Sequence, residues 1–157
     1  MANTVGMAVV GSAGIIGRQH VAEIVAASDA WLVAVTDLDS EVAQQQASEL
    51  GVRHHQTLED VLADGEVDAI SIATPHPSHH PIALKAFEAG KHVLCEKPIA
   101  VTPRQADEMV HGAEEAGVTL GIAYQCRWRP EVRNLKRMLD EGVVGEIYHT
   151  LLSFPDY

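Results

Sequence analysis

The sequence predicts an α/β protein built on a doubly wound parallel sheet. Short runs of β-branched and apolar residues alternate strictly with helical segments along most of the 157 residues, as in parallel sheets with helical crossovers. The first of these runs leads directly into a glycine-rich turn that opens a helical segment. Only 4% of residues are aromatic, so Ala, Val, Ile and Leu must fill the core, as they do where helices cover a sheet on both faces.

Six runs predict the strands of this sheet. Each run is short, rich in β-branched residues and followed by turn-forming residues or by the start of a helical pattern. The predicted strands are Thr4–Val10, Trp31–Thr36, a short one near Arg53–Gln56, Val67–Ala73, His92–Cys95 and Val118–Ala123.

Capping residues delimit the helices between these strands. Thr57 and Thr102 are expected N-caps, and Gly51, Gly90 and Gly117 are expected to end helices at positions that favour a left-handed backbone. The predicted helices are Gly14–Ala27 with an apolar stripe of Ile15, Ile16, Val21, Ile24 and Val25, then Asp39–Leu50, residues 58–63, Pro81–Ala89 and 103–116.

The chain divides into one domain over residues 1–124 and a segment of different character over 125–157. Pro130–Glu141 has the pattern of an amphipathic helix, and Gly145–Phe154 has the pattern of a strand. We interpret this segment as the hinge, the helix and the first strand of an incomplete α+β domain. Because a lone strand exposes unpaired backbone groups, we expect it to be poorly ordered or to pair with a second copy as a homo-oligomer.

The net charge of −11 argues against nucleic acid and anionic membranes as partners, since both are usually bound through basic surfaces. No apolar run approaches the roughly 20 residues of a membrane span, and the N-terminus does not read as a signal peptide. Two cysteines, Cys95 and Cys126, make no disulfide framework. We therefore expect a cytoplasmic protein with a buried, inert Cys95.

A glycine loop follows the first strand and opens the first helix, which is the context that a dinucleotide site requires. Asp37 ends the second strand about 20 residues further on, where an acid accepts hydrogen bonds from the adenosine ribose and repels a 2′-phosphate. We therefore predict NAD rather than NADP. A P-loop is excluded because Arg18 and Gln19 follow the last glycine, whereas an S-adenosylmethionine site stays open at this point. The expected cofactor-binding residues of the loop are Gly11, Ser12, Ala13, Gly14, Ile15, Ile16 and Gly17.

Two further motifs lie at the carboxyl ends of strands, where parallel sheets bind ligands. Thr74-Pro75-His76 and then His79 follow the fourth strand, and Glu96-Lys97-Pro98 follows the fifth. With these motifs the sequence resembles the Gfo/Idh/MocA oxidoreductase family from about Val5 to Tyr148. The resemblance also includes the glycine loop with Arg18 and His20, then Asp37, and Arg127 and Pro130 ahead of a helix that ends in Gly142-x-x-Gly145-Glu146.

The resemblance implies a Rossmann fold and an NAD(P)-dependent dehydrogenase that passes a hydride between nicotinamide and a hydroxyl-bearing carbon of a sugar or cyclitol. Lys97 and Glu96 are the implied catalytic residues, because a lysine ammonium can stabilise a developing alkoxide and Glu96 would lie beside the nicotinamide ribose. The Lys97–Pro98 bond is implied to be cis. Thr74, Pro75, His76 and His79 are implied cofactor contacts, together with Glu96 and Lys97.

The family's downstream Asp-x-x-x-His segment, the usual source of the proton acceptor, is absent from this sequence. We therefore expect the chain to bind NAD(H) and to be catalytically incomplete by itself. The alternative is a non-catalytic NAD-binding sensor or regulatory module. The Glu96-Lys97-Pro98 triplet argues against a methyltransferase.

We predict no metal site, because no carboxylate or thiolate has the spacing to complete a shell with the histidines. His20 is expected to be packed and hydrogen-bonded.

Overall fold

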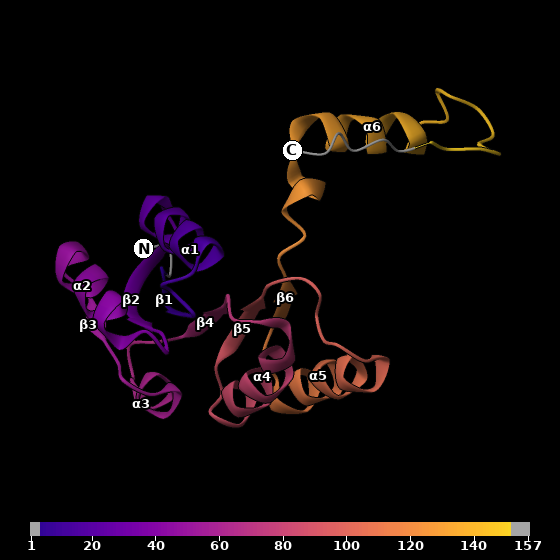
Figure 1. Ribbon diagram of the computed structural model, residues 1–157. Helices are drawn as coiled ribbons and strands as arrows, with labels where there is room; N and C mark the ends of the chain where they lie inside the picture. Colours follow the sequence, from indigo (N-terminus) through magenta and orange to yellow (C-terminus); the bar gives the residue numbers. More distant parts are fainter. Residues whose placement is uncertain (1–3, 152–157) are drawn as a thin grey trace. The chain divides into compact units, whose positions relative to one another are not determined.

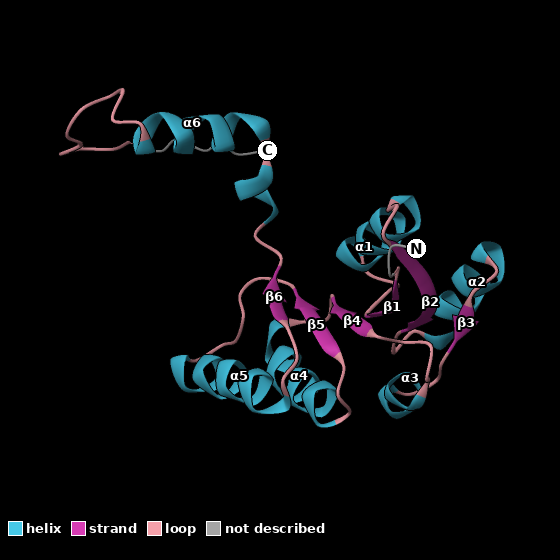
Figure 2. Cartoon of the chain, turned by 180° about the vertical axis from the view of Figure 1, so that it is seen from behind, coloured by secondary structure: helices cyan, strands magenta, loops and turns pink. Residues whose placement is uncertain are grey.

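The computed structural model describes residues 4–151. Six parallel strands form one sheet in the order β3-β2-β1-β4-β5-β6, which confirms the predicted α/β class and the doubly wound topology (Figures 1 and 2). The chain leaves β1 on one side toward β2 and returns on the other side at β4, so the order reverses at β1. The strands are β1 (Val5–Val10), β2 (Ala30–Thr36), β3 (Arg53–His54), β4 (Ala69–Ile72), β5 (His92–Cys95) and β6 (Leu120–Ile122).

Most helices begin and end at the predicted caps, although α4 (His79–Glu88) has its C-cap at Ala89, one residue before the predicted Gly90. Thr57 and Asp60 form a reciprocal capping box, and Gly51 and Gly117 adopt a left-handed backbone at the ends of their helices. One helix starts earlier than the predicted Pro81, because a 3-10 turn after β4 leads straight into it. The helices are α1 (Ile15–Ala26), α2 (Ser40–Leu50), α3 (Leu58–Ala63), α4 (His79–Glu88), α5 (Pro103–Ala116) and α6 (Pro130–Asp140), with 3-10 turns η1 (His76–Ser78) and η2 (Gln125–Trp128).

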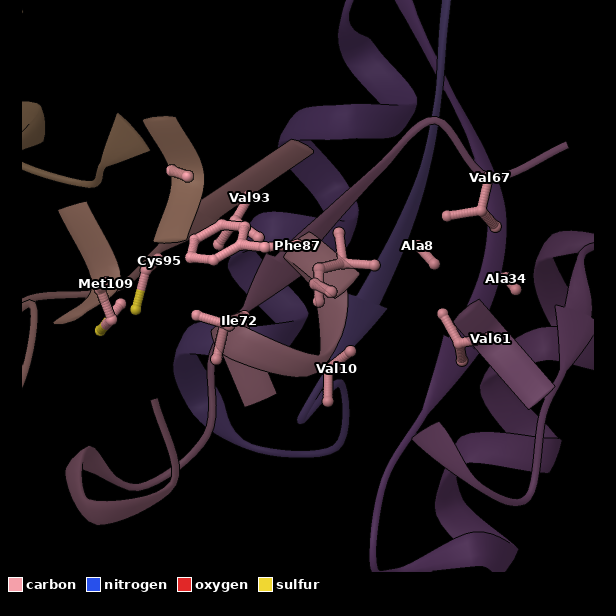
Figure 3. Close-up of a cluster of buried hydrophobic side chains, with 14 of the residues drawn as sticks. Ala8, Val10, Ala34, Val61, Val67, Ile72, Phe87, Val93, Cys95 and Met109 are labelled. Carbon is pink, nitrogen blue, oxygen red and sulfur yellow. The ribbon is translucent and has the colours of Figure 1, made fainter. Parts of the chain in front are cut away.

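The sheet is covered on both faces. Alternate residues of β1 point to opposite sides, so Val9 packs with Val21 of α1 and Ala47 of α2, while Ala8 and Val10 join the other layer. That second layer carries the larger cluster, in which side chains of α3, α4 and α5 meet β4 and β5 (Figure 3). Its labelled members include Val61, Ile72, Phe87, Val93, Cys95 and Met109.

The buried face of α1 differs from the predicted apolar stripe. Ile15 is 88% exposed and Val25 is 55% exposed, whereas Gly17, His20, Val21 and Ile24 are buried. The buried set has helical spacing, but a glycine and a histidine occupy two of its positions. A search for apolar residues alone therefore finds Val21 and Ile24 but misses the other two buried positions.

Of the described residues, 4–123 form one compact unit and 124–151 belong to a second. Its helix α6 confirms the predicted amphipathic helix. The predicted strand is not found over residues 145–151, which have no strand conformation; a strand needs a neighbouring edge for its backbone hydrogen bonds. The rest of that predicted strand, residues 152–154, lies outside the described residues. Within residues 4–151, none of the helices has the length and apolar character needed to cross a membrane.

Candidate cofactor site

The glycine loop is packed tightly against the ends of two strands. The N–H of Gly11 donates to the carbonyl of Thr36 at 2.9 Å, and Gly11 has a φ of +89°. A Cβ on Gly11 would lie 2.8 Å from the Ala73 carbonyl oxygen, and one on Gly17 would lie 1.9 Å from the Gly11 carbonyl oxygen. Glycine at these two positions is therefore required by the chain's own packing.

Gly14 is different, and its surroundings test whether the loop fits a dinucleotide. Its backbone is extended, and a Cβ there would meet only the Gly11 carbonyl oxygen, at 3.9 Å. No side chain caps the N-terminus of α1, which begins at the next residue, and Ile15 lies exposed beside it. The chain itself therefore leaves space at Gly14 in front of a helix N-terminus, which is the arrangement that binds a pyrophosphate.

Asp37 links the end of β2 to this loop. Its Oδ2 accepts a hydrogen bond of 2.8 Å from the N–H of Ala13, and its Oδ1 accepts one of 2.9 Å from the N–H of Asp39. Asp39, in turn, caps α2 by accepting from the N–H of Val42. Because a carboxylate has about four acceptor sites, Asp37 retains capacity for two ribose hydroxyls.

A cleft of about 630 Å³ joins these parts at the carboxyl ends of the strands, beside the reversal of strand order at β1. That volume lies within the roughly 300–1,000 Å³ of small-molecule pockets. The glycine loop, the end of β2 and the Thr74-Pro75 turn contribute to its walls. Its lining comprises Val10, Gly11, Gly14, Thr36, Asp37, Leu38, Gln56, Thr57, Leu58, Glu59, Ala73, Thr74, Pro75, Ser78 and Ile82.

Sequence reasoning missed several lining residues near Asp37. Leu38 is fully exposed next to Asp37, and Gln56, Thr57 and Glu59 also line the cleft. An exposed leucine directly after the acid of the second strand is a sequence signal that could have been used. Such an apolar side chain offers a surface on which a flat base can lie.

Ser12 does not line the cleft. It is fully buried, and its side-chain oxygen has no hydrogen-bond partner among the described residues. The predicted contact of Ser12 with the cofactor stays a prediction, and its buried side chain packs within the protein.

Glu96 and Lys97 have opposite environments after β5. Lys97 is exposed, and its peptide bond to Pro98 is cis, as the resemblance implied. Glu96 is 7% exposed, and its Oε1 lies 3.0 Å from His20 Nε2 while its Oε2 accepts from the N–H of Lys97 at 3.1 Å. Both carboxylate oxygens of Glu96 are therefore occupied by the protein's own groups, and its place beside the nicotinamide ribose stays a prediction. The expected packed and hydrogen-bonded role of His20 is confirmed.

His79 is also buried rather than at the surface of the site. Its side chain is inaccessible, with Nδ1 2.9 Å from the carbonyl oxygen of Pro98 and Nε2 2.9 Å from that of Thr74. The His79 ring therefore joins the Thr74 and Pro98 loops, and its contact with the cofactor stays a prediction. His76 is exposed and packs edge-on against the His79 ring at 5.7 Å between ring centroids.

The Cys126 thiol is free and exposed, whereas Cys95 is buried and two histidines are paired with carboxylates. Burial, helped by the charge of Glu96, raises the pKa of the Cys95 thiol to about 12, which confirms it as an inert core residue. His55 lies 3.0 Å from Asp64, and His80 lies 2.7 Å from Glu108. Within residues 4–151, no cluster of three or more His, Cys, Asp or Glu side chains has the geometry of a metal site.

The fold and the site together define a dinucleotide-binding domain of the Rossmann type. The family model described as "Oxidoreductase family, NAD-binding Rossmann fold" matches residues 5–124, so the chain belongs to the Gfo/Idh/MocA oxidoreductase family. This confirms the resemblance and NAD as the cofactor of the family's domain. It also removes the methyltransferase alternative.

Known relatives are longer than this chain. A 1,5-anhydro-D-fructose reductase from Ensifer adhaerens is 36% identical over 134 residues, covering 85% of this chain and 40% of that protein. D-glucoside 3-dehydrogenase from Escherichia coli K12 is 33% identical over 147 residues, covering 92% and 41%. The chain thus spans about 40% of the length of these curated relatives.

Solved structures with bound NAD or NADH are similar to this chain and are likewise longer than it. The WlbA dehydrogenase from Bordetella pertussis, in complex with NADH and UDP-GlcNAcA, superimposes with a TM-score of 0.87 at 33% identity, covering 93% of this chain and 42% of that one. GenD2 from gentamicin A biosynthesis, in complex with NAD, gives 0.85 at 31% identity, covering 91% and 41%.

Proposed function

We propose that this chain is the cofactor half of an NAD-dependent dehydrogenase that oxidises or reduces a hydroxyl-bearing carbon of a sugar or cyclitol. The observation that carries the proposal is the convergence, at the carboxyl ends of neighbouring strands, of the glycine loop, Asp37 and the Thr74-Pro75 turn around one cleft. The glycosidic and cyclitol substrates named for the relatives support the substrate class.

Each part of the site has a distinct task in this proposal. Gly14 and the N-terminus of α1 hold the pyrophosphate, and the Asp37 carboxylate accepts from the adenosine ribose hydroxyls. The bound nicotinamide supplies the hydride acceptor or donor. Lys97, exposed after β5, stabilises the negative charge that develops on the substrate oxygen.

Cofactor binding is tested by titrating the chain with NADH and following nicotinamide fluorescence, with NADPH in parallel. We expect saturable binding of NADH and weaker binding of NADPH, because the Asp37 carboxylate repels a 2′-phosphate. No signal at millimolar cofactor would overturn the proposal.

Oxidoreduction is tested by incubating the chain with NAD⁺ and a panel of sugars and cyclitols and following NADH formation by absorbance. NADH formation that Lys97→Met abolishes supports the assigned role of Lys97. We expect NADH binding without turnover, because the chain is expected to be catalytically incomplete by itself, and this result leaves the non-catalytic NAD-binding module open. NADH formation by the chain alone would overturn the expectation of incompleteness.

A further inference from the structure

Three buried polar side chains form a chain of contacts between α1 and the Glu96-Lys97-Pro98 loop. Ser71 of β4 lies 2.6 Å from Nδ1 of His20 on α1, and Nε2 of His20 lies 3.0 Å from Oε1 of Glu96. All three residues are less than a tenth exposed. The contacts join positions that are 51 and 76 residues apart in the sequence.

The chemistry of these contacts assigns one hydrogen. Because a carboxylate only accepts, Nε2 of His20 donates to Glu96, while the Ser71 hydroxyl can either donate to Nδ1 or accept from it. Two apolar side chains of similar volume would fold with less desolvation cost than this buried carboxylate and its partners. The network is therefore poorly explained by stability alone.

The network reaches the backbone of Lys97. The second oxygen of Glu96 accepts from the Lys97 N–H at 3.1 Å, so the carboxylate fixes the lysine backbone from one side. On the other side, the Pro98 carbonyl oxygen is 2.9 Å from Nδ1 of the buried His79. The lysine backbone is thus held between two anchored neighbours while its own side chain is exposed.

We propose that His20 is a positioning residue for Lys97, acting through the Glu96 carboxylate. Because His20 lies on α1, the helix that opens in the glycine loop also sets the place of the lysine, so the pyrophosphate end and the hydride-transfer end of the site share one rigid element. This inference rests on the proposed function, since it assumes that Lys97 lies beside a bound nicotinamide.

The test measures how far bound NADH protects Lys97 from acylation. The chain is treated with trace acetic anhydride, and acetylation of Lys97 is quantified by mass spectrometry relative to Lys136 of α6. At NADH about tenfold above its Kd, bound NADH can slow the acetylation of Lys97 by up to about tenfold in the chain without substitutions. A lysine that is no longer held spends time outside the covered position, so its protection falls.

Three variants separate positioning from folding. His20→Gln keeps an N–H donor near the place of Nε2, so we expect protection close to that of the unmodified chain. His20→Leu removes the donor, and we expect protection below about twofold at saturating NADH. His20→Leu combined with Glu96→Met replaces both partners by apolar groups, and we expect its thermal stability to exceed that of His20→Leu without recovery of protection.

The outcomes distinguish the two proposals. Protection in the double variant equal to that of the unmodified chain overturns the positioning role, and this measurement stands even if His20→Leu does not fold. Loss of protection in His20→Gln as complete as in His20→Leu also overturns it. If NADH fails to protect Lys97 in the chain without substitutions, then Lys97 does not lie beside the bound nicotinamide, and its role in the proposed function is wrong.

Discussion

The carboxylate of Asp37 is hydrogen-bonded to the backbone N–H of Ala13 at 2.8 Å, so the end of β2 holds the glycine loop in place. In the proposed function this one side chain has two tasks. It fixes the loop that would face the pyrophosphate, and it would offer its remaining acceptor sites to the ribose.

Replacing Asp37 is expected to weaken NADH binding by about tenfold or more, because hydrogen bonds to charged groups contribute about 1.5–3 kcal/mol. Asp37→Ala should affect NADPH less than NADH, since the substitution also removes the repulsion of the 2′-phosphate. Parallel fluorescence titrations with NADH and NADPH measure both effects. Asp39→Ala is the control: it removes the α2 cap at a cost of about 1 kcal/mol in stability and leaves the cleft carboxylate in place. Equal losses for NADH and NADPH in Asp37→Ala would contradict the assignment.

Gly14 and Gly17 are expected to respond oppositely to the same substitution. Gly14→Ala places a methyl where the chain has space, so stability should fall by less than about 1 kcal/mol. NADH affinity should fall by about tenfold or more, because the methyl blocks close approach of the pyrophosphate. Gly17→Ala places a methyl against the Gly11 carbonyl oxygen and should cost about 1–3 kcal/mol or more of folding free energy. Thermal unfolding followed by circular dichroism, with NADH titration, separates the two; an unaffected affinity in Gly14→Ala would exclude the pyrophosphate from this position.

The order of the elements could be predicted because the information is local. The capping box of Thr57 and Asp60 and the left-handed Gly117 mark helix ends within a few residues, and strands of a covered sheet are apolar throughout. Asp37 and Lys97 could be placed at the same edge of the sheet for a related reason, since the carboxyl ends of parallel strands share one edge.

The roles of the buried polar residues could not be predicted, because their partners are distant in the sequence. His20 sits on the buried face of α1 only because Ser71 and Glu96 satisfy its ring there. His79 likewise depends on carbonyl oxygens from two different loops. A motif identifies such residues, but it does not say whether the side chain faces the ligand or supports the loop that does.

His79 and His76 are expected to separate stability from binding. His79→Leu leaves the carbonyl oxygens of Thr74 and Pro98 without the ring as partner, and we expect a loss of about 1–3 kcal/mol in the free energy of unfolding. His76→Ala removes an exposed ring and should change stability by less than about 0.5 kcal/mol, while NADH binding weakens if the ring contacts the cofactor as the resemblance implies. Urea denaturation and NADH titration of both variants measure this. A His79→Leu protein as stable as the unmodified chain would show that the ring does not hold the two loops together.

Asp64 is expected to make folding stability depend on pH in the acid range. Its carboxylate lies 3.0 Å from His55 Nε2 and accepts from Arg53 at 2.7 and 2.8 Å. Burial alone would raise the pKa of Asp64, but the hydrogen bond from His55 and the charge and hydrogen bond of Arg53 outweigh it, so the pKa falls below its usual 3.8. A carboxyl group whose pKa is lower in the folded state stabilises the fold above its unfolded pKa, and this stability is lost as the pH falls through the folded value.

Asp64→Asn should therefore lower the free energy of unfolding near neutral pH by about 1.5–3 kcal/mol, the contribution of hydrogen bonds to a charged group. The difference between the unmodified chain and the variant should shrink as the pH falls below about 3.8 and disappear once Asp64 is protonated in both the folded and unfolded states. Urea denaturation at a series of pH values gives both curves. Glu59→Gln is the matched control: the hydrogen bond from Lys85 lowers the pKa of Glu59, but the pair is exposed and solvent screens it, so little stability should depend on it. A constant difference between the Asp64→Asn and unmodified curves across the acid range would mean that the carboxylate charge contributes nothing and that the variant differs only in the packing of its amide side chain.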